Sequence, residues 1–441
     1  MTETKAQLEL QGKSDEVFKS VSNALLSGKR LAIVEAPPGS GKTHMLLRVI
    51  DALIESGWRV ALAAQTNNQA SDVARRFANQ YPTRSTYRFA RSKSLAPSDF
   101  PKSAKWVTAM ADLPLTPGLH VSTTAKWATV QDAIPYQLLA IDEAWQMDWA
   151  KLMQCADLSE KFLMIGDPGQ IEPVTSVETS RWATSKRPPH RAAPEVVKGD
   201  PQLLQQAHVS YLPACRRLPN ASVDYVKPFY DFDFAAYAVP GDRTFASIKG
   251  GPIIDLLHDF SPLVVTISTP NDGPPQSTDN ELASTIKLII KDLLEAGILF
   301  STSSNESLLE LSQQHIGVVA SHRSMNGLIR KNLGAELAKI RIDTPERWQG
   351  LEVPFMIAVH PLSGVTDPAE FDLATGRLCV MASRQQVGLI FVTRDHVGKT
   401  VENVIPSATQ PPDNKDHIGL GRRAHLEFWN LLVSNNRIIS F

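Results

Sequence analysis

The chain has 441 residues and a formal net charge of −1, from 45 lysines and arginines against 46 aspartates and glutamates. This balance excludes a global electrostatic pull toward nucleic acid, so any such site must be a local patch. The length exceeds what one hydrophobic core usually serves and predicts two or three domains. Because the sequence shows neither a secretory apolar region at its start nor a run near the roughly 20 apolar residues of a membrane span, we expect a cytoplasmic protein without membrane contact.

Short apolar runs alternate with helical patterns along the chain, which is typical of parallel α/β layers. The expected strands are Leu31–Ala36, Val60–Ala64, His120–Thr124, Leu138–Asp142, Phe162–Asp167, Leu263–Ser268, Ile316–Ser321, Phe355–Pro361, Leu378–Ala382 and Leu389–Thr393. Regular structure is expected to be weakest in three stretches rich in Pro, Ser or Gly, namely Arg84–Pro117, Ser185–Pro201 and Pro270–Ser277. We predict two α/β domains, residues 1–208 and 209–441, with a cleft between them and a small excursion from the first domain at 84–117.

A glycine-rich segment, Ala36-Pro37-Pro38-Gly39-Ser40-Gly41-Lys42-Thr43, joins the first strand to a helical pattern from His44 to Glu55. The glycines let backbone N–H groups curl toward a phosphate, and the helix N-terminus adds the positive end of its dipole. Lys42 can reach the β- and γ-phosphates, and the Thr43 hydroxyl can ligate Mg²⁺. The strand–loop–helix context favours this interpretation over an accidental Gly-Lys-Thr in a plain turn. It predicts ATP or GTP with Mg²⁺, bound by Pro38, Gly39, Ser40, Gly41, Lys42 and Thr43.

Two later strand ends carry polar groups suited to the same site. Asp142 and Glu143 follow the fourth expected strand, where the Asp can hold the metal and the Glu can polarise the attacking water. The next strand runs into Gly166-Asp167-Pro168-Gly169-Gln170, which places the Gln170 amide where it can sense a γ-phosphate. Each element alone has a plainer interpretation, a solvated strand edge or an ordinary turn, and the ordered set decides against it.

The ordered segments resemble the motifs of superfamily 1 helicases, in particular the branch that contains the nonsense-mediated-decay helicase. The phosphate loop is similar to motif I, and the remaining motifs are Ala63–Asn67 (Ia), Val121–Thr124 (Ic), Asp142–Gln146 (II), Gly166–Gln170 (III), Cys215–Pro219 with Phe229–Tyr230, Ile316–Arg323 (IV), Arg347–Glu352 (V) and Arg377–Arg384 (VI). The match spans residues 30–394 in the family's order, so it is specific as a set.

The resemblance implies two tandem RecA-like P-loop domains, with ATP and Mg²⁺ in the cleft between them. Lys42 and Thr43 would hold phosphate and metal, Asp142 the metal, and Glu143 would be the base. Gln170 would report the γ-phosphate, Arg216 and Arg384 would be arginine fingers, and Gly350 and Glu352 would contact the nucleotide. Three departures concern recognition of the nucleotide's adenine base and motif VI. Cys215 stands where the family stacks an aromatic on adenine, motif VI lacks its usual second arginine, and the upstream glutamine has no clear counterpart among Gln11, Asp15 and Glu16.

A locally basic region supports a nucleic-acid track on the first domain. Between residues 73 and 130, Asp99 and Asp112 oppose nine cations, with four aromatics interleaved: Arg75, Arg76, Arg84, Arg88, Arg91, Lys93, Lys102, Lys105 and Lys126, with Tyr87, Phe89, Trp106 and Trp127. Paired phosphates and stacked bases need this combination, although a solvated surface over buried aromatics is the plainer interpretation for any single residue. The expected contacts to the backbone are Thr66, Asn67 and Thr123, with His322 and Arg323 in the second domain.

The sequence therefore predicts an ATP-dependent helicase or translocase on single-stranded nucleic acid, which by resemblance moves 5′ to 3′, with DNA favoured over RNA as the track. Two alternatives stay open. One is an ATP-gated switch or loader that clamps nucleic acid or a protein without unwinding, and the other is a phosphate-loop ATPase acting on a protein target. A chain with so few accessory elements is also expected to be recruited by a protein partner.

Overall fold

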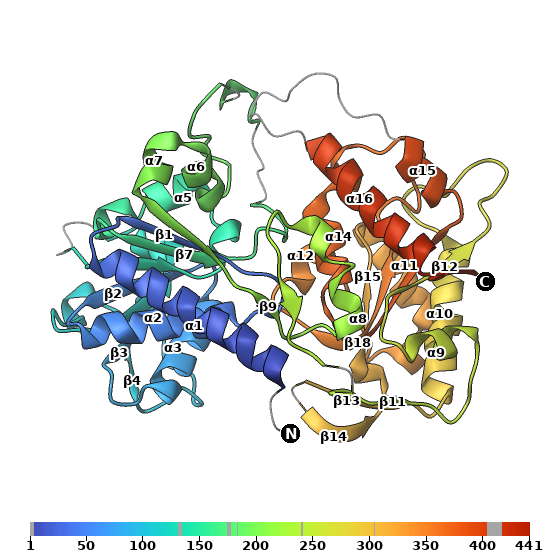
Figure 1. The fold of residues 1–441 in the computed structure, drawn as a ribbon, viewed down its shortest axis with the longest axis horizontal. Helices are drawn as coiled ribbons and strands as arrows, with labels where there is room; N and C mark the ends of the chain where they lie inside the picture. Colours follow the sequence, from blue (N-terminus) through green and yellow to red (C-terminus); the bar gives the residue numbers. More distant parts are fainter. Residues whose placement is uncertain are drawn as a thin grey trace. The chain divides into compact units, whose positions relative to one another are not determined.

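The computed structural model describes residues 4–130, 135–173, 178–182, 184–239, 241–303, 305–403 and 417–441. Its contacts divide the chain into two compact units (Figure 1). The first unit comprises Met1–Pro168 and Glu172–Pro213, and the second comprises Gly169–Ile171 and Ala214–Phe441. The division therefore falls between residues 213 and 214 rather than at the expected 208 and 209. The last two residues of the Gly-Asp-Pro-Gly-Gln segment, together with Ile171, belong to the second unit. Each unit is described separately below.

The first unit contains an eight-stranded sheet in which every neighbouring pair of strands is parallel. Its order is β4-β3-β5-β2-β6-β7-β1-β8, from β1 (Leu31–Glu35), β2 (Arg59–Ala64), β3 (Thr86–Phe89), β4 (Ala104–Val107), β5 (Gly118–Thr123), β6 (Leu138–Ile141), β7 (Phe162–Gly166) and β8 (Ala207–Tyr211). The central strands β1, β2, β5 and β6 are buried along their whole length because helices cover both faces.

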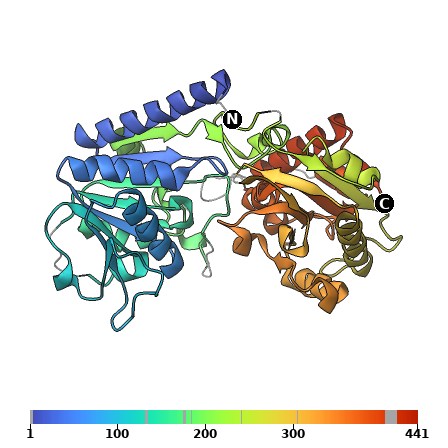
Figure 2. The same cartoon turned by 90° about the horizontal axis from the view of Figure 1, so that it is seen from below.

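The two faces of this sheet carry different helices. One face packs against α1 (Lys5–Leu26), α2 (Lys42–Glu55) and α3 (Asn67–Gln80), and α1 runs along the unit beside α2 (Figure 2). The other face packs against α4 (Thr124–Trp127), α5 (Trp149–Met153), α6 (Ala193–Gly199) and α7 (Pro201–Gln206). Since all strands are parallel, their carboxyl ends meet at one edge, which collects the residues that follow β1, β2, β5, β6 and β7.

The second unit has a six-stranded parallel sheet in the order β16-β15-β17-β18-β12-β19. Its strands are β12 (Leu263–Ile267), β15 (Ile316–Val319), β16 (Arg341–Asp343), β17 (Val353–Val359), β18 (Gln385–Arg394) and β19 (Ile438–Ser440). A smaller antiparallel sheet joins β11 (Phe245–Ala246), β13 (Leu299–Thr302) and β14 (Asn305–Glu310), and β9 (Ala214–Cys215) pairs with β10 (Ala235–Ala236).

Helices cover both faces of the second sheet as well. Residues of α9 (Pro252–Leu257), α10 (Asn280–Glu295) and α11 (Arg323–Leu333) join one core cluster. The opposite cluster contains α8 (Asn220–Val223), α12 (Pro345–Trp348), α13 (Glu370–Leu373), α14 (Thr375–Ala382), α15 (Val397–Asn403) and α16 (His417–Ser434). The predicted α/β class with two parallel sheets, the pattern of tandem RecA-like P-loop domains, is confirmed.

One expected strand was wrong and several elements were missed. Leu378–Ala382 lies in helix α14, because a short run that is buried on all sides has no periodicity to separate helix from strand. The excursion at 84–117, expected to be irregular, contributes β3 and β4 to the main sheet, and the stretch at 185–201 contains α6. In these stretches tertiary burial overrides the turn-forming composition.

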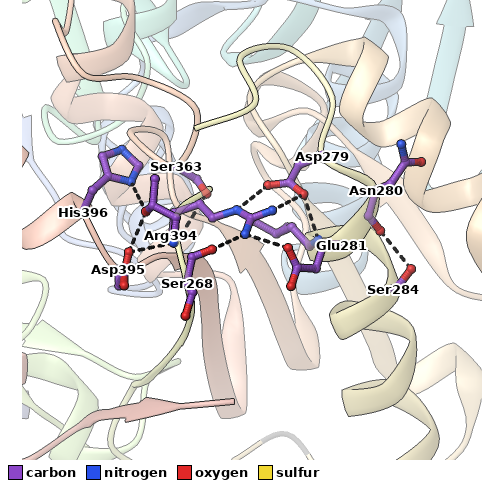
Figure 3. A network of polar contacts seen from close by, with 11 residues as sticks. Ser268, Asp279, Asn280, Glu281, Ser284, Ser363, Arg394, Asp395 and His396 are labelled. Atoms are coloured by element: carbon purple, nitrogen blue, oxygen red, sulfur yellow. Dashed lines mark hydrogen bonds and ion pairs between the residues drawn. The ribbon is translucent and has the colours of Figure 1, made fainter. Parts of the chain in front are cut away.

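A buried ion pair fixes the carboxyl edge of the second sheet (Figure 3). Arg394, the last residue of β18, is 1 % exposed and donates from Nε and Nη2 to the two carboxylate oxygens of Asp279 at 2.7 and 2.8 Å. Its Nη1 donates to Glu281 at 2.8 Å, and its backbone N–H donates to Ser363 Oγ at 3.3 Å. Asp279 also caps α10 by accepting from the Leu282 N–H, so one arginine ties a strand, a helix start and a loop together.

We predict that Arg394→Met lowers the free energy of unfolding by about 3–5 kcal/mol, because it leaves the Asp279 carboxylate buried without its partner. Urea denaturation followed by tryptophan fluorescence measures this loss. Arg341→Met is the matched control, since Arg341 pairs with Asp343 at 3.3 Å on the exposed strand β16. Equal stabilities of the two variants would contradict the role given to Arg394.

Candidate nucleotide-binding site

The phosphate loop of the first unit has the backbone that its sequence predicts. Gly39 and Gly41 have φ of 64° and 82°, in the left-handed region that glycine tolerates without strain. Gly41 is the N-cap of α2, and no side chain caps this helix start. The first N–H groups of a 14-residue helix therefore stay available for an anion. The hydroxyl of Ser40 is buried and makes no hydrogen bond within the described part of the chain, so it is a further donor for phosphate.

Strand β6 brings two carboxylates to this loop. Lys42 Nζ lies 3.0 Å from Glu143 Oε1, and the Thr43 hydroxyl lies 3.5 Å from Asp142 Oδ2. The structure thus assembles four predicted site residues that are a hundred positions apart in sequence. Parallel strands cause this convergence, because β1 and β6 end at the same edge of the sheet.

The turn after β6 holds its carboxylates in an unusual conformation. Glu143 has φ of 52° and ψ of 48°, a left-handed conformation that non-glycine residues seldom adopt and that is found preferentially at functional sites. Its N–H donates to Asp142 Oδ1 at 3.0 Å. Burial, and then the neighbouring Glu143 charge, raise the pKa of Asp142 to about 7, against the opposing effect of Lys42. Such a carboxylate gains from a cation that would replace its proton.

Thr43 and Asp142 fit an Mg²⁺ ion. Their oxygens are 3.5 Å apart, close to the roughly 3 Å between adjacent ligands of an octahedral Mg²⁺. A hydroxyl and a carboxylate are the hard oxygen donors that this ion prefers.

Helix α6 supports the site from the other face of the sheet, a role that sequence reasoning missed. Glu195 Oε1 accepts a hydrogen bond from Trp145 Nε1 at 3.0 Å, two residues after Glu143. Lys198 pairs at 2.6 Å with the fully buried Glu35, the residue that precedes the phosphate loop. The helix therefore binds the ends of both β1 and the motif after β6. The pairing of Lys198 with Glu35 could not be predicted from the sequence.

Gln170 belongs to the second unit, whereas the sequence assigned it to the first domain. Its side chain is buried, and its backbone carbonyl is so close to Gly376 that a Cβ there would lie 2.7 Å away. The adjoining Ile171 is part of the second unit's core and accepts a hydrogen bond from Gln349 Nε2 at 3.3 Å.

The second unit gathers the segments expected to contact nucleotide from that domain. Glu352 accepts hydrogen bonds from Arg217 Nε at 2.8 Å and from Gln386 Nε2 at 2.9 Å. Arg217 also donates to the carbonyl oxygen of Ser383 at 3.3 Å, which adjoins Arg384. Glu352 is thus an organiser of three motifs in this structure. Arg217 and Gln386 were not predicted, although the doubled arginine at 216–217 was a usable signal.

The two predicted arginine fingers have different surroundings. The Arg216 guanidinium stacks on the Tyr237 ring, 3.8 Å from its centroid, and its carbonyl oxygen accepts from Arg243 at 3.4 Å. Arg384 is 1 % exposed and donates to the Ser383 hydroxyl at 3.3 Å. Gly350 has φ of 75°, which suits the turn before Glu352. Cys215 is fully buried in the core, so it offers no surface for a base.

The expected nucleic-acid contacts lie at the carboxyl edges of the two sheets. Thr66 caps α3 in a reciprocal arrangement with Gln69, Asn67 is the first residue of that helix, and Thr123 caps α4. His322 lines a crevice at the ends of β15 and β17, and Arg323 begins α11. The helices that follow β15 and β17 pack on opposite faces, so this crevice is a topological switch point where open sheets bind ligands.

The basic region is less open than its composition suggested. Phe89 and Trp127 are buried in the core, so the expectation that they stack on bases is wrong. Arg75, Arg76 and Arg84 each form ion pairs with aspartates, which were not all counted in the sequence window: Asp72 and Asp99 for Arg75, Asp72 for Arg76 and Asp51 for Arg84.

Comparison with known protein families gives a match within the first unit. Residues 18–210 match the family described as an AAA domain, which is less than half of the chain. The phosphate loop described above lies within the matched residues, in keeping with a P-loop nucleotide-binding domain. No curated protein matches this chain.

Solved structures similar to this chain include viral helicases at low identity. The helicase of PRRSV is 15 % identical with a TM-score of 0.42, over 85 % of this chain and 54 % of that one. Arterivirus nonstructural protein 10 (helicase) is 16 % identical with a TM-score of 0.45, over 87 % and 63 %. Its complex with DNA gives 16 % and 0.41, over 86 % and 63 %. The chain thus spans less than two thirds of the length of these proteins.

None of the helices in the described ranges has the length and apolarity needed to cross a bilayer.

We predict that the Mg²⁺ concentration for half-maximal nucleotide hydrolysis rises as the pH falls below the Asp142 pKa of about 7. Protons and metal compete for this carboxylate, so at one pH unit below the pKa the affinity for the metal is about tenfold lower. Titrations of Mg²⁺ at pH values on both sides of 7 measure the effect, and Asp142→Asn removes it. A half-maximal concentration independent of pH would contradict the assignment.

Proposed function

We propose that this chain is an ATP-dependent motor, a helicase or translocase, that moves on single-stranded nucleic acid. The observation that carries the proposal is the cluster of Lys42, Thr43, Asp142 and Glu143 around an uncapped phosphate loop. The ordered motif set from residue 30 to 394 gives the motor its class, and by resemblance its direction is 5′ to 3′. DNA is favoured over RNA as the track.

The geometry suggests how the proposed general base is held before nucleotide binds. Lys42 and Glu143 form an ion pair at 3.0 Å, so the base and the phosphate-binding cation neutralise each other. A triphosphate carries more negative charge than one carboxylate, so Lys42 leaves Glu143 and pairs with the phosphates. Glu143 is then free to accept a proton from the attacking water. Binding of the triphosphate therefore frees the general base.

The remaining residues hold the phosphates during transfer. N–H groups of the loop and the first turn of α2, together with the Ser40 hydroxyl, surround the β-phosphate. Thr43 and Asp142 would hold Mg²⁺, which when bound neutralises charge on the β- and γ-oxygens. Arg216 and Arg384 are proposed to stabilise the charge that develops on the γ-phosphoryl group, on the strength of the motif resemblance.

An ATP-gated switch or loader that clamps nucleic acid without unwinding it is the second candidate. It is supported by the absence, from the described ranges, of a folded accessory domain beyond the small β11-β13-β14 sheet. Displacement of a duplex strand by the isolated chain separates the two, since only the motor produces it.

We predict that single-stranded DNA or RNA stimulates ATP hydrolysis by the full chain, and that Lys42→Ala abolishes the stimulated rate. The variant removes the cation that binds the β- and γ-phosphates. A coupled assay of phosphate release with each polymer measures both effects. Lys29→Ala, on a loop before β1 where Lys29 donates to the Gln205 carbonyl, is the matched control. Hydrolysis indifferent to both polymers would point instead to an ATPase with a protein target.

We also predict that Arg216→Ala lowers the stimulated turnover by about 10³ with little change in nucleotide affinity, because a finger acts on the transition state. Arg341→Ala, an exposed arginine on β16 of the same unit, keeps the wild-type rate. Steady-state kinetics with varied ATP separates the two parameters. An Arg216→Ala turnover equal to that of Arg341→Ala would remove Arg216 from the mechanism.

A further inference from the structure

Arg88 of β3 carries a positive charge into the interior of the first unit. Its side chain is 1 % exposed, and none of the carboxylates in the described ranges forms an ion pair with it. Burial lowers the pKa of the guanidinium to about 10, so the group stays charged at neutral pH. A buried cation without an opposite charge is costly and rare, and folds normally supply a carboxylate. Arg75, Arg76 and Arg84 of the same region each have one, whereas Arg88 does not.

The guanidinium is hydrogen-bonded, but only to neutral groups. Its Nη2 donates to Asn67 Oδ1 at 2.9 Å, and its Nε donates to Ser71 Oγ at 3.4 Å. Its Nη1 donates to the carbonyl oxygens of Phe89 and Val121. These partners fix the position of the side chain and leave its charge unneutralised.

The unneutralised charge lies directly beneath the carboxyl edge of the sheet. Asn67 is exposed and opens α3, which packs beside β3 (Figure 1). Because its amide oxygen accepts from Arg88, its Nδ2 donors are directed away from Arg88. A buried positive charge, an amide donor and a helix N-terminus thus converge here.

We infer that Arg88 is a positioning residue for a phosphodiester of the bound strand, which supplies the missing negative charge at Asn67. The inference rests on the proposed function, since it takes single-stranded nucleic acid as the ligand. Arg88 orients the Asn67 amide so that it donates to a phosphate oxygen, and its charge attracts that phosphate through low-dielectric protein. The contact is to the backbone, so it adds affinity without base preference.

The test measures binding of a fluorescently labelled single-stranded DNA to the full chain by anisotropy, over a range of salt concentrations. Arg88→Met is expected to weaken binding about tenfold or more, the effect of a lost charged hydrogen bond. The slope of log affinity against log salt is expected to shrink by about 0.7, the amount for one phosphate contact on a single strand. Arg88→Lys keeps the charge and is expected to keep the slope.

Arg30→Met is the matched control, with the same change of charge at the opposite edge of the sheet. Arg30 immediately precedes β1, is exposed, and donates to the Glu160 carbonyl oxygen. It is expected to bind the strand as the wild type does. If Arg30→Met weakens binding as much as Arg88→Met, net charge explains the result and the inference is overturned.

Asn67→Ala gives a second and independent test, because Asn67 is exposed and its replacement leaves the core intact. If Arg88 acts through Asn67, the double variant binds no more weakly than Arg88→Met, whereas additive losses overturn this coupling. Should Arg88→Met not fold, a wild-type affinity and slope for Asn67→Ala would still overturn the inference. If the wild-type chain binds no single strand at any salt concentration, the proposed function is overturned as well. If the wild type and all variants bind the strand equally well, only this inference is overturned.

Discussion

Parallel pairing of buried strands is the constraint from which the sites of this protein arise. Strands covered on both faces are mostly apolar, so most of the polar chemistry of the sheet gathers at its ends. All eight strands of the first sheet end at one edge, and there Lys42, Asp142 and Glu143 meet although a hundred residues separate them. The second sheet does the same for the crevice that contains His322.

Three cations, fully buried in Arg394 and Arg88 and partly buried in Lys42, show how differently one fold treats desolvation. Arg394 is matched by Asp279 in a two-point contact, and the pair serves architecture. Lys42 and Glu143 are matched with each other only until a more anionic partner arrives. Arg88 is matched by no described carboxylate, and its neutral partners hold it in place. The stability that a fold forgoes at such positions is the usual mark of a binding role, because a purely structural cation would have acquired a counter-charge.

Contiguous chemistry could be predicted from the sequence, and long-range pairing could not. The phosphate loop is local: its glycines, lysine and threonine lie side by side in the chain, and the flanking strand and helix follow from apolar periodicity. The Leu378–Ala382 helix was missed because an apolar run that is buried on every side has no periodic signal. The Arg88–Asn67 and Arg217–Glu352 contacts depend on strand order and on turns, which no local pattern specifies. The RecA-like class was therefore predictable, whereas the support around each site was not.

The assignment of Gly169–Ile171 to the second unit, between two stretches of the first, bears on how such a protein could be divided or recombined. The chain passes from one unit to the other three times rather than once. A fragment ending at residue 213 would separate Ile171 from the core in which it is buried. A fragment starting at residue 214 would lack Ile171 in that core. The two units are thus interlocked at the level of the covalent chain. Gene fusion or domain exchange at the apparent boundary would therefore yield two incomplete parts.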